Sequence, residues 1–279
     1  MIYVKKNVRK LSNDMMRYER GLLPLFSVEK VHRLRTTYKK LRALIVFVQS
    51  FMTAPPVMER RLKVYYRTLG QLRNIQLLSV RICSEHTIAY CDIQQQFWVL
   101  EEKCKSQIKD MHIKHILRRW MHKDIHKFPI NTPEINARLY FNETLIKIQA
   151  IAFRQFIEDE DLHSIRKLLK DAYYLSVMFG FWQKGTATEW AELMNDLGLF
   201  HDNVTQCRLI NQILLEIKKP ESRVHLQEQL EILKNEAERM RSMLIEMVIA
   251  TFGRSEQFAS FRTTEPAICD YYPSLDKRC

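Results

Sequence analysis

Two segments of the chain carry histidine, arginine and lysine at positions that return to one side of a helix. The first row contains His32, Arg35, Lys39 and Arg42, and the second contains His163, Arg166, Lys170 and Tyr173. Offsets of 0, 3, 7 and 10 share a face because an α-helix turns about 100° per residue. Arginine and lysine bind phosphate oxygens, and aligned cations repel one another without an anion. We therefore predict that both rows bind a polyanion, with ion pairs between helices as the alternative.

A second pair of matching segments follows the rows and indicates an internal duplication. Residues 69–74 read LGQLRN, and residues 197–202 read LGLFHD. Gly70 lies 38 residues after His32, and Gly198 lies 35 residues after His163. A glycine inside a helix costs about 1 kcal/mol relative to alanine. Gly70 and Gly198 therefore predict a close approach of helices behind the two histidines.

Neighbouring polar residues complete the predicted phosphate site. Lys40 and Lys167 flank the two rows, and Arg73 lies in the first glycine segment. Asn74 and Asp202 are predicted to accept hydrogen bonds from the rows and to orient them. The predicted phosphate contacts are His32, Arg35, Lys39, Lys40, Arg42, Arg73, His163, Arg166, Lys167 and Lys170.

These paired motifs resemble the conserved histidine α-helical domain (CHAD) family. The family pattern is V/L-H-x-L-R-x-x-x-[RK]-[RK]-L-R followed by an L-G segment that ends in Asp, and the resemblance covers about residues 1–252. It implies two four-helix bundles related by a pseudo-twofold axis, with a basic channel that binds inorganic polyphosphate through the rows. Three positions depart from the pattern: Tyr173 replaces an Arg, Asp171 lies beside the row, and Asn74 replaces an Asp. We expect the second half to bind more weakly than the first.

The elements that must position these residues are predicted to be helices throughout. Six glycines and eight prolines are few for a chain of 279 residues, since sheet proteins need many turns. Eight helices are predicted at residues 4–22, 27–52, 56–82, 85–127, 134–156, 158–182, 186–220 and 222–252. This is an all-α fold in two sets of four helices. We expect one CHAD-like domain over 1–252, with halves of about 1–130 and 131–252, and a C-terminal tail at 253–279.

The positive charge is concentrated in the first quarter of the chain. Residues 1–70 hold sixteen Lys and Arg against four acids, which equals the net +12 of the whole chain. Such a local excess is typical of a surface that binds anions, with a solvated basic face as the alternative.

Cysteine usage and hydropathy indicate a cytoplasmic protein. The six cysteines are Cys83, Cys91, Cys104, Cys207, Cys269 and Cys279. They form no CxxC pair, which argues against a zinc site or a disulfide framework and favours free thiols. The first residues lack the apolar stretch of a secretory signal, and the best apolar run, 41–52, is too short to span a bilayer. We expect a soluble protein with no membrane partner, located in the cytoplasm and associated with polyphosphate granules.

Two other functions compete with polyphosphate binding. The first is metal binding or metal-dependent phosphohydrolysis on the predicted helix 85–127, where a stripe contains His112, His115, Arg119, His122 and His126. His122 and His126 have the i, i+4 spacing of metal ligands, but no acid interleaves them. The second is binding of nucleic acid or an acidic protein, although aromatic residues are few among the N-terminal bases. No catalytic or cofactor motif is evident, so we predict neither an enzyme nor a cofactor.

Overall fold

The computed structural model describes residues 1–82, 91–180 and 186–253, without the side chains of 186–189. The predicted tail beyond Gly253 lies outside the described residues, and so do Cys83, Cys269 and Cys279. The described residues form nine α-helices and one 3-10 helix, which confirms the all-α prediction. The elements are α1 (Val4–Leu22), α2 (Val28–Gln49), α3 (Arg60–Ile82), α4 (Cys91–Asp110), α5 (Ile113–Asp124), η2 (Ile125–Lys127), α6 (Glu134–Ala152), α7 (Asp159–Phe179), α8 (Thr186–Glu216) and α9 (Pro220–Phe252).

The prediction of one continuous helix over 85–127 is wrong. The chain breaks between α4 and α5, where His112 adopts a left-handed backbone with φ 46°. The carboxylate of buried Glu19 on α1 accepts the backbone N–H of Ile113 at 3.0 Å and so satisfies the new helix N-terminus. A contact with a distant helix therefore creates this boundary, and eight predicted helices become nine.

The other helix boundaries follow local sequence signals. The hydroxyl of Ser27 accepts the backbone N–H of Lys30 at 3.4 Å, as predicted for the cap of α2. Gly180 ends α7 with φ 77°, a left-handed conformation that glycine adopts at little cost. Pro220 occupies the first turn of α9, where its missing N–H is not needed.

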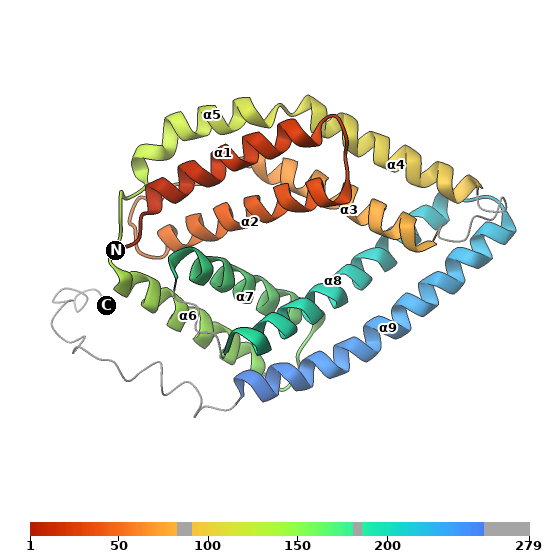
Figure 1. Ribbon diagram of the computed structural model, residues 1–279. Helices are drawn as coiled ribbons and strands as arrows, with labels where there is room; N and C mark the ends of the chain where they lie inside the picture. Colours follow the sequence, from red (N-terminus) through yellow and green to blue (C-terminus); the bar gives the residue numbers. More distant parts are fainter. Residues whose placement is uncertain (83–90, 181–185, 254–279) are drawn as a thin grey trace, which may run out of the picture.

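Four helices of the N-terminal half, α1, α2, α3 and α5, form a bundle, as Figure 1 shows. α1 packs against α2 and α5, and α3 packs against the same two helices. α8 and α9 form a long pair at the other side of the molecule, with α6 and α7 packed beside them. The two groups of helices meet where α2 contacts α7 and where α3 contacts α8. None of the described helices combines the length and apolar character needed to cross a bilayer.

Two apolar cores hold this arrangement together. The first lies in the N-terminal bundle and extends to Ile213 on α8 and Leu230 on α9. The second is built by α6 to α9, around residues such as Ile165 and Leu197. The helical period predicts that Leu34, Leu41 and Ile45 of α2 and Ile165, Leu168, Ala172 and Leu175 of α7 face the core, and all of them are buried except Leu168, which is half-buried. Because α8 and α9 contribute to both cores, the α2 and α7 rows are fixed relative to each other.

Candidate phosphate-binding site

Basic side chains from α2, α3, α7 and α8 converge where the two groups of helices meet. Burial lowers the pKa of His32 on α2, and the next contributions come from Arg73 on α3 and from Lys39, with Lys170 on α7 also acting on it. His201 on α8 is influenced in the same way by Arg166 and Lys39. We name this group the basic cluster, and its members are His32, Arg35, Lys39, Arg73, His163, Arg166, Lys170 and His201.

Lys39 lies among cations from both halves of the chain. Burial, as the largest cause, and the neighbouring charges of Lys170, Arg35 and Arg166 together lower the pKa of Lys39 to about 6. Burial also lowers the pKa of Lys170 to about 8. Neither lysine forms an ion pair with a carboxylate of the described residues. The cluster is therefore short of negative charge, which is the condition for binding an anion.

The carboxylate of Asp202 on α8 offsets some of this repulsion. Asp202 acts to raise the pKa values of Arg35, Arg166 and Lys170, against the dominant lowering by burial. This effect is in the direction expected of a residue that orients the rows. Within the described part of the chain, however, Asp202 accepts no hydrogen bond from a residue of either row. Asn74 is half-buried and likewise makes no described hydrogen bond to the rows. Asp171, which is paired with Arg42, also acts on Lys39, but these carboxylates are fewer than the cations of the cluster, so the balance stays positive.

The Arg35 guanidinium is held by aromatic and backbone contacts. It stacks over the ring of Tyr66 at 4.7 Å, and its Nη1 donates to the Tyr66 carbonyl oxygen at 3.3 Å. The Tyr66 ring in turn stacks on Tyr38 at 4.4 Å. A Cβ at Gly70 would overlap the guanidinium, so glycine makes room for Arg35 and not for the histidine as predicted. Tyr66 was not predicted, because only its position on the neighbouring helix brings it to the row.

Several buried nitrogen atoms of the cluster lack a partner among the described residues. They are the Nε atoms of Arg35, Arg73 and Arg166 and the Nδ1 atom of His163. Buried polar atoms in folded proteins are nearly always hydrogen-bonded to protein, water or ligand. Donors of this kind on arginine are well matched to phosphate oxygens.

Two histidines of the second half form a stacked pair. The rings of His163 and His201 lie 4.5 Å apart with an interplanar angle of 22°. Burial lowers the pKa of His163 to about 4 and that of His201 to about 3, with Lys167 and Arg166 adding to the respective effects. Both rings are therefore neutral near pH 7 in the free protein. His201 was missed as a site residue, although the sequence repeat aligns it with Arg73.

Arg42 differs from the sequence expectation. It was predicted as a free phosphate contact at the end of the first row, but its Nη2 donates to Asp171 Oδ1 at 2.7 Å. Asp171 lies on α7 and is buried, so this ion pair crosses from one half of the chain to the other. The acid that departs from the family pattern therefore neutralises the last arginine of the first row.

The two flanking lysines are placed differently. Lys167 is exposed on α7, and its charge is the largest cause, after burial, of the lowered pKa of His163. Lys40 is half-buried on α2 and makes no ion pair with any described residue. The structure thus connects Lys167 to the cluster and leaves Lys40 outside it.

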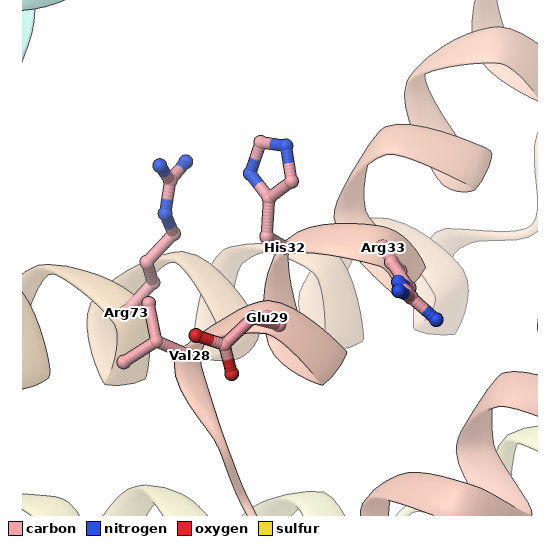
Figure 2. Close-up of a pocket in the computed structure, with 5 residues that line it drawn as sticks. All are labelled: Val28, Glu29, His32, Arg33 and Arg73. Atoms are coloured by element: carbon pink, nitrogen blue, oxygen red, sulfur yellow. The ribbon is translucent and has the colours of Figure 1, made fainter.

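The edge of the cluster opens to solvent at a shallow pocket of about 340 Å³. Figure 2 shows the His32 ring and the Arg73 guanidinium pointing to the same side, while Arg33 points away from them. In the same view the Glu29 carboxylate lies between His32 and Arg73, near the backbone from which their side chains project. His32 and Arg73 are therefore the members of the cluster that a ligand in this pocket would meet.

The histidine stripe of the predicted long helix does not form one face. His112 precedes α5 in a left-handed conformation, and His126 belongs to η2. The rings of His112 and His115 have their centroids 6.3 Å apart. Across the described ranges, no three or more His, Cys, Asp or Glu side chains are grouped so that they could hold a metal ion. The premise of the metal-site alternative, one unbroken helix face, is wrong.

Comparisons with known proteins agree with the motifs and the fold. The family profile of the CHAD domain matches residues 7–211, and no curated protein sequence matches significantly. The crystal structure of the CHAD domain from the plant Ricinus communis is similar over 90% of this chain and 92% of that chain, with a TM-score of 0.69 and 14% identity. PptA from Streptomyces chartreusis is similar over 88% of this chain and 97% of that chain, with a TM-score of 0.63 and 14% identity. The chain belongs to the CHAD domain family.

Proposed function

We propose that the basic cluster binds inorganic polyphosphate or a similar linear polyanion, without catalysing a reaction. The observation that carries this proposal is the position of Lys39, whose pKa is lowered to about 6 by burial and by cations from both halves of the chain. Structures keep such an arrangement at a cost in stability, which an anionic ligand would offset. The CHAD family resemblance favours polyphosphate as that ligand.

A linear chain of phosphates suits the geometry better than a single anion. The cluster draws side chains from α2, α3, α7 and α8, so a ligand that carries several phosphates can contact several of its cations at once. Each phosphate of such a chain can accept hydrogen bonds from an arginine fork or a lysine ammonium group. Binding of this kind releases counterions and weakens steeply as salt concentration rises. A cytoplasmic protein at polyphosphate granules would meet this ligand directly.

Charge reversal tests the proposal. The double variant Arg35→Glu with Lys39→Glu is expected to weaken polyphosphate binding at least tenfold, because it replaces two cluster cations with anions. Binding is measured by fluorescence anisotropy over a series of salt concentrations, with single-stranded DNA as the competing polyanion. The matched control is Arg61→Glu with Lys63→Glu, since both side chains are exposed and neither belongs to the cluster or lines its pocket.

The outcomes separate binding from folding. Circular dichroism reports whether the double variant keeps its helices, and Arg35→Gln with Lys39→Gln provides a milder change if it does not. Equal polyphosphate affinity in the cluster and control variants would refute the site. Tighter binding of single-stranded DNA than of polyphosphate by the unaltered protein would favour the nucleic-acid alternative.

A further inference from the structure

A second concentration of positive charge lies outside the basic cluster. α1, α5 and η2 together hold eleven Lys and Arg against three acids, a net +8. Nine of these basic side chains are exposed, among them Lys10, Arg119 and Lys123, and we name these nine the outer basic face. Four exposed histidines lie on the same α5–η2 segment or directly before it. Five of the sixteen Lys and Arg of residues 1–70 therefore belong to this face, against three in the first polyphosphate row.

The acids on these helices neutralise only a small part of the outer basic face. Glu19 is buried and accepts the Ile113 backbone N–H. Asp124 is buried and paired with Lys127, and Asp14 is half-buried and paired with Arg17 at 2.8 Å, so seven of the nine exposed cations have no ion pair with an acid of these elements. None of the three carboxylates of α1, α5 and η2 is exposed, so the solvent side of these elements presents cations alone.

The outer basic face is separated from the cluster by the N-terminal bundle. α1 and α5 contact each other and lie side by side at one edge of the molecule in Figure 1. α2 and α3 form the other side of this bundle, and it is they that contact α7 and α8. An anion held in the basic cluster would therefore leave the charge of the outer basic face uncompensated, since a bundle thickness exceeds the screening length of about 8 Å in physiological salt.

Exposed apolar side chains accompany this charge. Tyr3 is 59% exposed at the start of α1, and Ile130 is 69% exposed in the segment that follows η2. A backbone bridge between Ile2 and Thr132 holds these two segments together, at 3.0 Å for each hydrogen bond. Leu25 is 62% exposed beyond the other end of α1. A phosphate backbone offers no partner for such groups, whereas the interface of a bilayer accepts both tyrosine and aliphatic side chains.

We propose that the outer basic face docks the protein on the surface of an anionic lipid membrane. The cations would lie against acidic headgroups, and the apolar residues at the ends of α1 would enter the interface. The described helices include none that could span the bilayer, so the association is peripheral. The basic cluster would then face away from the lipid and remain open to polyphosphate.

Co-sedimentation with vesicles tests this docking. The full-length protein is expected to bind vesicles of phosphatidylcholine and phosphatidylserine, to bind pure phosphatidylcholine vesicles much less, and to be released by salt. The triple variant Lys10→Glu, Arg119→Glu, Lys123→Glu is expected to lose at least tenfold in affinity for the acidic vesicles. The matched control Lys103→Glu, Lys218→Glu, Arg239→Glu has the same net charge and changes exposed residues elsewhere, so its affinity should be retained.

Two further measurements identify the partner. Tyr3→Ser with Ile130→Ser should weaken vesicle binding and leave the affinity for duplex DNA unchanged, because only the lipid interface uses these side chains. The triple variant should keep the polyphosphate affinity of the unaltered protein. Equal binding to both kinds of vesicle, equal losses in the triple and control variants, or no effect of the serine variant would each overturn the proposal. Loss of polyphosphate affinity in the triple variant would also overturn it and assign the face to the polyphosphate path.

Discussion

At the residue scale, the decisive feature of the site is which cations lack a counter-charge. Lys39 and Lys170 have no described carboxylate partner, whereas Arg42 is bound by Asp171 at 2.7 Å. An arginine already paired with a buried carboxylate gives up that partner when it binds a phosphate, and so contributes little to affinity. Asp171 therefore limits how many phosphates the first row can engage.

Removing the charge of Asp171 is expected to strengthen polyphosphate binding. Asp171→Asn keeps an acceptor for Arg42 but frees the arginine's charge for the ligand. The slope of log affinity against log salt concentration should steepen by about 1, the value for one added phosphate contact. The double variant Asp171→Asn with Arg42→Gln should return to the slope of the unaltered protein. An unchanged slope in Asp171→Asn would show that Arg42 does not reach the ligand.

At the scale of the elements, the spacing between helices decides where each guanidinium lies. Arg35 occupies the space that a side chain at Gly70 would fill, and α3 therefore holds it against Tyr66. Gly198, the corresponding glycine of the second half, has more free space around it. A Cβ at Gly198 would lie 3.9 Å from Arg166 Nε and Lys170 Nζ, which is an ordinary van der Waals contact.

This difference predicts unequal effects of the same substitution. Gly70→Ala should displace the Arg35 guanidinium and weaken polyphosphate binding by about tenfold, the value of one charge-assisted hydrogen bond. Gly198→Ala should leave the affinity nearly unchanged. Both variants should keep their helices in circular dichroism, since alanine is the better helix former by about 1 kcal/mol. Equal effects on affinity at the two positions would contradict the role assigned to Gly70.

At the scale of the whole molecule, the site exists because both halves contribute to it. Lys39 comes from the first half, and two of the three charges with the largest effect on its pKa, Lys170 and Arg166, come from the second. The shared cores along α8 and α9 hold these charges together in the folded protein. In the unfolded chain they separate, and the pKa of Lys39 returns to its ordinary value of 10.5.

This difference makes both stability and binding depend on pH. Between about pH 6 and 10.5 the unfolded chain holds a proton on Lys39 that the free folded protein lacks, so the free energy of unfolding should rise with pH in this window. A bound polyanion favours protonated Lys39, so binding should take up protons and weaken as the pH rises above about 6. Lys170 should add to this effect above about pH 8.

Calorimetry at pH 7.5 measures this proton uptake directly, in buffers of different ionisation enthalpy. Lys39→Gln should reduce it by nearly one proton per site. The unprotonated fraction of Lys170, together with His163 and His201, which are neutral in the free protein, would account for any uptake that remains. An uptake in Lys39→Gln equal to that of the unaltered protein would show that Lys39 is already charged before the ligand binds.

The sequence alone was sufficient to predict the all-α fold, most of the helices, the two basic rows and the family. These depend on the period of about 3.6 residues per turn and on local breaks such as Gly180 and Pro220, which act over a few neighbouring residues. The periodicity also predicted which residues of α2 and α7 are buried. The internal repeat remains a prediction from the aligned segments.

Only the tertiary structure decided which of the predicted residues act together. It pairs Arg42 with Asp171, brings Tyr66 and His201 to the rows, and breaks the long helix at His112. Each of these outcomes depends on contacts between helices that are far apart in the sequence. Such contacts are set by how whole helix faces pack, and the spacing of residues along one helix contains no information about them.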